Sequence, residues 1–138
     1  MRARILLLAA VALLCAGCGG DPQSAATGPR AAAAADLTGV RWLPADGAAG
    51  GRAYAEFAPD GTWTGSDGCN GQGGTWSLDA DGTFTATANP STLIGCENVP
   101  VAQWVSSAVR VAVDGGDLLL QRTSAPAGAV GAARLVRG

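Results

Sequence analysis

Short stretches in which apolar and polar residues alternate fill the chain from residue 37 onward. Successive side chains of a β-strand point to opposite faces, so this period of two predicts strands with one buried face. Ala53, Ala55 and Phe57, for example, would share the inner face of one strand. Turn-forming pairs such as Asp81-Gly82 separate the stretches. Strands are predicted at residues 40–43, 53–57, 62–64, 75–78, 83–88, 111–113, 118–122 and 132–136.

The period changes once, after Pro100. Apolar residues then recur at intervals of three and four, the spacing of one helix face, at Val101, Trp104, Val105, Ala108 and Val109. Asn98 is a suitable cap for this helix, Pro100 suits its first turn, and Arg110 would lie near its negative end. Trp104 is predicted to pack against the sheet rather than to form a ligand platform, because an aromatic on an apolar stripe usually faces the core.

These elements predict one mainly β (α+β) domain over residues 37–138. A compact antiparallel sheet, or a partly open β-barrel closed by the single helix, fits the order of the elements. Large apolar residues are few, so the core is expected to depend on a small set of aromatic anchors, namely Trp42, Phe57, Trp63, Phe84 and Trp104.

The N-terminus resembles the export signal of a bacterial lipoprotein. Two arginines precede the apolar run 5–14, which is too short to span a bilayer comfortably, and small residues lead directly to Cys18. Residues 1–17 are therefore predicted to be a signal peptide, with Cys18 as the lipidated N-terminus. The alternative is an ordinary signal peptide followed by an incidental cysteine. Residues 18–36 are rich in Gly, Ala, Ser and Pro and are predicted to form a flexible tether that reaches ~25 Å.

This reading places the domain on the cell membrane or outer envelope, facing the extracytoplasmic side. After removal of residues 1–17, seven arginines remain against eleven acids, a formal charge of about −4. An acidic surface does not suit nucleic acid or anionic lipid headgroups, so the acyl chains are expected to be the membrane attachment. The chain is expected to be a monomer.

Catalytic chemistry has few candidates. The sequence has no histidine and no lysine, which removes Ser–His–Asp, Cys–His and Schiff-base arrangements. Asp67 and Glu97 could form an acid pair, but solvated turn carboxylates are the plainer interpretation. We therefore expect no enzyme activity, no metal and no cofactor.

Cys69 and Cys96 are the two cysteines of the globular part. Each follows a glycine that favours a turn, and the envelope exterior is oxidising, so a structural disulfide is predicted. A zinc site would need further ligands, and the spacing is not that of a Cys-x-x-Cys redox pair.

Several residues around these cysteines carry a family resemblance. They are Gly68, Cys69, Asn70, Gly74, Trp76, Thr92, Gly95 and Cys96, followed by the helix and the apolar run 118–120. In this order they resemble the META domain, also called HslJ-like, from residue 37 to about residue 136. The resemblance implies a compact antiparallel β fold with one helix, association with the envelope, and no catalytic mechanism. The chain departs from the family at Gln72, where an aromatic is common, and at Trp76, where tyrosine is usual.

The expected function is that of a lipid-anchored envelope protein with a non-catalytic binding, assembly or stress-related module. Its partner would be an envelope protein or a hydrophobic ligand held against the sheet. Two alternatives stay open. One is an inhibitor of an extracellular hydrolase that uses loops such as 46–51 or 66–71, and the other is a purely structural envelope protein without a dedicated ligand.

Overall fold

The computed structural model describes residues 28–92, 95, 96, 98–122 and 131–138. The predicted signal peptide, Cys18 and the first part of the tether lie outside these ranges. The elements are β1 (Arg30–Ala31), α1 (Ala34–Leu37), β2 (Arg41–Pro44), the 3-10 turn η1 (Ala48–Gly51), β3 (Ala53–Phe57), β4 (Thr62–Asp67), β5 (Gly71–Leu78), β6 (Phe84–Ala86), α2 (Val101–Ser107), β7 (Arg110–Asp114), β8 (Asp117–Gln121) and β9 (Ala133–Arg137).

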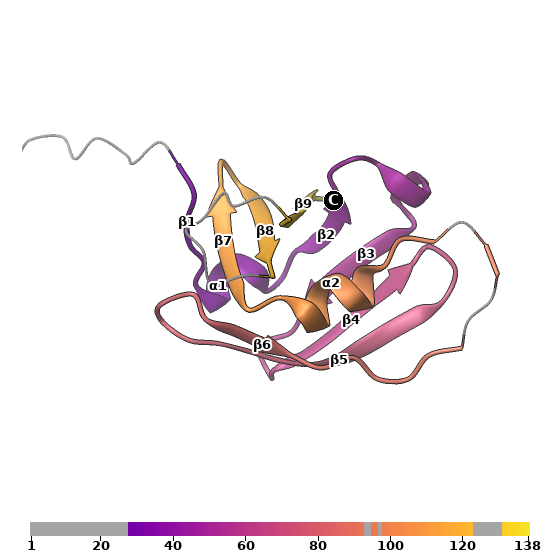
Figure 1. Cartoon of the computed structure of the whole chain (residues 1–138), viewed down its shortest axis with the longest axis horizontal. Helices are drawn as coiled ribbons and strands as arrows, with labels where there is room; N and C mark the ends of the chain where they lie inside the picture. Colours follow the sequence, from indigo (N-terminus) through magenta and orange to yellow (C-terminus); the bar gives the residue numbers. More distant parts are fainter. Residues whose placement is uncertain (1–27, 93–94, 97, 123–130) are drawn as a thin grey trace, which may run out of the picture.

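The strands form one curled antiparallel sheet in the order β1-β7-β8-β9-β2-β3-β4-β5-β6 (Figure 1). The curl brings the two ends of the sheet together. The N–H of Phe84 donates to the carbonyl of Val109 (2.9 Å), and the N–H of Val111 donates to the carbonyl of Gly82 (3.0 Å). The predicted mainly β, single-domain fold with one substantial helix is confirmed, and its shape is a half-barrel whose ends are joined over a short distance.

Helix α2 packs against β3, β4 and β6 and covers part of the inside of the curl (Figure 1). Val101 and Val105 are its fully buried residues. The helix is shorter than its apolar pattern predicts, because it ends at Ser107 and the chain is extended from Ala108. Val109 consequently lies outside the helix and is 40% exposed.

The predicted aromatic anchors occupy the interior to different degrees. Trp42, Phe57, Trp63 and Phe84 are each at most 2% exposed, whereas Trp104 is half-buried at the side of the core. Trp76 also belongs to this interior. The ring centre of Phe57 lies 5.5 Å from that of Trp76 and 6.1 Å from that of Phe84, and both contacts are edge to face. Such aromatic contacts add to the free energy gained by burying apolar area.

The folded domain begins earlier than the sequence indicates. Strand β1 pairs with β7, and residue Ala32 is 3% exposed, so the C-terminal part of the predicted tether belongs to the fold. Arg30 forms two hydrogen bonds with the carboxylate of Asp36, both at 2.8 Å. The hydrogen bond from Arg30 lowers the pKa of Asp36 to about 2. The segment is held by backbone pairing and by this ion pair. It contains few large apolar residues, so its sequence gives no sign that it belongs to the folded domain.

Candidate functional site

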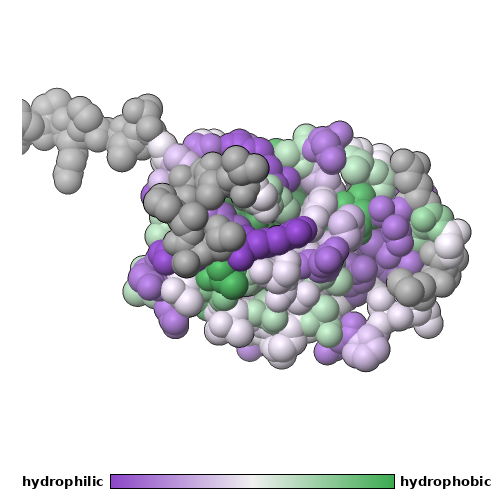
Figure 2. All heavy atoms as spheres, in the orientation of Figure 1, coloured by the Kyte–Doolittle hydropathy of each residue, from purple (hydrophilic) through white to green (hydrophobic). Residues whose placement is uncertain are grey.

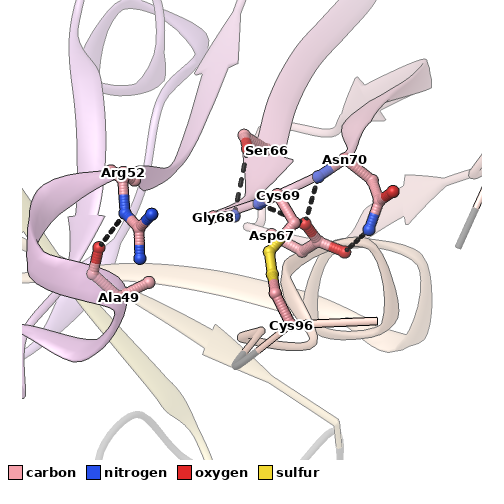
Figure 3. Close-up of a disulfide and its surroundings, with 8 residues drawn as sticks. All are labelled: Ala49, Arg52, Ser66, Asp67, Gly68, Cys69, Asn70 and Cys96. Carbon is pink, nitrogen blue, oxygen red and sulfur yellow. Dashed lines mark hydrogen bonds between the residues drawn. A yellow bond between two sulfur atoms is a disulfide. The ribbon is translucent and has the colours of Figure 1, made fainter. Parts of the chain in front are cut away.

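Asp67 is the centre of the turn that joins β4 to β5, and it is 2% exposed. Its Oδ1 accepts hydrogen bonds from the backbone N–H groups of Cys69 (2.8 Å) and Asn70 (2.6 Å), and its Oδ2 accepts one from the side-chain amide of Asn70 (2.9 Å) (Figure 3). Gly68 lies between them with φ of 105°, which side chains rarely tolerate. One buried carboxylate therefore fixes the conformation of the whole turn.

The ionisation of Asp67 follows from the same contacts. Burial raises the pKa of its carboxyl, but hydrogen bonds from Asn70, Cys69 and Asn98 outweigh that effect, and the pKa lies below the ordinary 3.8. Asp67 is thus ionised at neutral pH, and its oxygens are engaged in holding the turn. Glu97, the other half of the possible acid pair, lies outside the described residues.

The predicted disulfide joins Cys69 in this turn to Cys96, with 6.5 Å between the two Cα atoms. Figure 3 shows the bridge running from the turn to the segment that precedes α2. A second link runs parallel to it, since the carbonyl of Asp67 accepts a hydrogen bond from the N–H of Val99 (2.8 Å). The bridge engages both sulfurs, and the described residues hold no group of three or more His, Cys, Asp or Glu side chains that could bind a metal.

The start of α2 is held by Gln72 of β5. Oε1 of Gln72 accepts a hydrogen bond from the N–H of Ala102 (2.9 Å). The prediction that Asn98 caps the helix is wrong, because Pro100 occupies the cap position and makes no side-chain cap bond, while Asn98 bonds to Asp67. The sequence does not reveal the role of Gln72, since the N–H that it binds lies 30 positions away and no local pattern links the two residues.

Two of the other residues that carry the resemblance, Gly74 and Trp76, contribute to strand packing and hydrogen bonding. Gly74 lies in β5 where a Cβ atom would come within 2.0 Å of the carbonyl oxygen of Thr87. That close approach lets the indole N–H of Trp63 donate to the same oxygen at 2.8 Å. The indole N–H of Trp76 donates to the carbonyls of two residues at the β3–β4 turn. Thr92, in contrast, is exposed in the connection after β6.

A pocket of about 430 Å³ opens on the outer face of β2, β3 and β4, away from the disulfide turn. Its polar groups come from Arg41, Glu56, Thr62 and Thr64. Nε of Arg41 donates to the carboxylate of Glu56 at 2.5 Å, and its guanidinium lies 4.1 Å from the ring centre of Tyr54. The remaining lining residues are Gly39, Val40, Phe57, Ala58 and Pro59.

This pocket was not predicted from the sequence. Arg41 and Glu56 are 15 positions apart, and they meet only because they are opposite each other in the pairing of β2 with β3. Glu56 and Thr64 are likewise opposite each other in the pairing of β3 with β4. The alternation of β3 and β4 does assign these side chains to the outer face, which is the one signal that the sequence contains.

The loop 46–51 lies at the same end of the sheet as the disulfide turn, because Ala53 pairs with Asp67. Figure 3 shows Ala49 and Arg52 beside the turn, with Nε of Arg52 donating to the carbonyl of Ala49 (3.1 Å). Ala49 has φ of 56°, a left-handed conformation that is uncommon for a residue with a side chain.

Comparison with protein-family models, curated proteins and solved structures finds no match to this chain. Within the ranges that the structure describes, no helix is long and apolar enough to cross a bilayer. The face seen in Figure 2 is a mosaic, in which hydrophilic and weakly polar residues separate small hydrophobic areas. Among the described residues, Val109 is the single large apolar side chain that is exposed.

Proposed function

We propose that this chain is a lipid-anchored protein of the cell envelope, and that its META-like domain is a non-catalytic binding module. The observation that carries the proposal is the disulfide between Cys69 and Cys96. Structural disulfides persist in oxidising compartments, and the signal-like N-terminus that ends at Cys18 would deliver the chain to such a compartment. Two features far apart in the sequence thus favour the same location.

A binding role is favoured over catalysis by what the polar groups do. Among the described residues of the turn and the bridge, the buried carboxylate of Asp67 holds the turn, and the bridge engages both sulfurs. The pocket on β2–β4 presents a guanidinium, a carboxylate and hydroxyls on rigid strands. Such groups recognise a ligand by hydrogen bonding and need no reactive nucleophile.

A structural envelope protein without a ligand is the second candidate. It is favoured by the packed aromatic interior and by Val109 being the one exposed large apolar residue of the described chain, since a site for a hydrophobic peptide or lipid would present an apolar patch. The hydrolase-inhibitor alternative rests on loop 46–51 lying beside the turn 66–71, both held by internal hydrogen bonds.

The anchor is tested with two cysteine variants expressed in a bacterial host that processes lipoproteins. Cells are fed an alkyne fatty acid, and the N-terminal peptide is analysed by mass spectrometry. We expect lipid on Cys18 of the wild type, none on Cys18→Ser, and retained labelling of Cys15→Leu, which removes the neighbouring cysteine but keeps that position of the signal segment apolar. Labelling that survives in Cys18→Ser, or a wild-type N-terminus cut elsewhere without lipid, would contradict the proposal.

A further inference from the structure

We propose that the pocket on the outer face of β2, β3 and β4 binds a neutral oligosaccharide. This deepens the proposed binding role by naming the class of ligand, and it does not depend on the lipid anchor. The pocket volume of about 430 Å³ lies within the usual range of ligand sites, roughly 300–1,000 Å³. That volume is large enough for a short oligosaccharide.

The position of the pocket argues against recognition of an extended peptide. Peptides that bind sheets usually add a strand to an unpaired edge. Here the backbone is paired on both sides, because Arg41 is opposite Glu56, Glu56 is opposite Thr64, and Thr64 is opposite Gly73. The strands offer their side chains to a ligand, and recognition must come from side-chain groups.

Those side-chain groups match vicinal hydroxyls. Arg41 uses Nε to bond Glu56, and within the described chain its two terminal guanidinium nitrogens and the hydroxyl of Thr64 have no hydrogen-bond partner. A guanidinium only donates and a carboxylate only accepts, while a sugar hydroxyl does both. Neighbouring hydroxyls of one sugar ring can therefore accept from Arg41, donate to Glu56, and exchange a hydrogen bond with Thr64.

Charge balance selects a neutral ligand. Arg41 and Glu56 form an ion pair at the pocket, so their charges cancel. A phosphate or carboxylate ligand would meet Glu56, and an ammonium ligand would meet Arg41, each with an unfavourable contact that offsets the favourable one. A neutral polyhydroxyl ligand bonds both members of the pair without that repulsion.

The rest of the surface fits a sugar ring and a chain that continues beyond it. Val40, Ala58 and Pro59 give the pocket apolar walls for the C–H face of a ring. Next to Thr64, β5 contributes Gly73, which has no side chain, and beyond it along β5 the exposed Thr75, whose hydroxyl shares a hydrogen bond with that of Thr87 (2.9 Å). Where an oligosaccharide would extend beyond the pocket, the outer face therefore has a position without a side chain and neighbouring threonines.

The test is calorimetric titration of the purified full chain with short neutral oligosaccharides of β-linked glucose, mannose and N-acetylglucosamine. An anionic galacturonate oligosaccharide and a pool of extended peptides serve as comparison ligands. We expect a dissociation constant on the order of 0.1–1 mM for at least one neutral sugar, as befits a small polar ligand on an open site. Thr64→Val, which replaces one hydroxyl by a methyl group, should weaken that binding about fivefold to tenfold.

The matched control is Thr85→Val. Thr85 is an exposed threonine of β6 that does not line the pocket, so its replacement should leave the affinity within about twofold of the wild type. Both substitutions are on exposed strand positions, and thermal unfolding will verify that the variants fold. The proposal is overturned if no neutral oligosaccharide binds, if Thr64→Val and Thr85→Val bind equally well, or if the galacturonate or the peptides bind in preference. None of these results bears on lipidation of Cys18, so this inference can fail while the anchor stands.

Discussion

Removal of the disulfide offers the most direct test of how the turn and the helix are held together. The bridge closes a loop between positions 27 apart, and the chain-entropy relation assigns such a loop about 3.5 kcal/mol of stabilisation. A domain of this size has a total stability of roughly 5–15 kcal/mol, so the bridge supplies a large part of it. We therefore expect the double variant Cys69→Ser, Cys96→Ser to fold with a much lower free energy of unfolding.

The assay is thermal and urea unfolding followed by tryptophan fluorescence, because four tryptophans report on the fold. A loss of about 3.5 kcal/mol corresponds to a decrease in Tm of roughly 15–25 °C for a domain of about 100 residues. Reduction of the wild type serves as the control and should give nearly the same Tm as the double variant. A decrease below about 5 °C would refute the reasoning, since it would mean that Asp67 and its hydrogen bonds hold the turn without the bridge.

Two further predictions follow from the same elements. Trp104→Ala should lower the free energy of unfolding by about 2 kcal/mol in urea titrations. The loss is smaller than for a fully buried tryptophan because Trp104 is half-buried, and a loss above about 4 kcal/mol would show instead that Trp104 is a main core residue. Asp67→Asn should destabilise the domain at neutral pH and flatten its acid dependence. The lowered pKa of Asp67 gives stability that is present above pH 3.8 and lost as the pH falls through the folded-state pKa, so an unchanged slope of stability below pH 4 would contradict this account.

Alternation of apolar and polar residues predicts strands well where large side chains carry the pattern. Strand β3 has Ala53, Ala55 and Phe57 buried as expected. Strand β5 begins at Gly71, four residues before its predicted start, because its first half includes three glycines with no side chains to alternate. The helix is likewise found at Val101, but its end differs because chain pairing of β7 with β8 begins at Arg110.

Contacts between distant segments explain what the sequence does not reveal about the site. The disulfide is predictable because the candidate residues are few, whereas the cap from Gln72 and the pocket around Arg41 depend on strand register. In the sequence, a polar residue on the outer face of a strand looks the same whether or not the folded sheet brings it next to other polar residues. The early start of the domain at Arg30 belongs to the same class, because an ion pair six positions apart has no periodic signature.

The outer edge of β7 has a consequence for whether copies of this protein pair with one another. An unpaired strand edge is a template for aggregation, since it presents open N–H and C=O groups to any neighbouring chain. Two separate segments occupy this edge, with β1 opposite Ala112 and Val113 and residues 82–84 hydrogen-bonded to Val109 and Val111. The short strand β1 thus protects part of this edge as well as connecting the tether to the domain, and its loss would leave the backbone groups of Ala112 and Val113 open to pairing with another chain.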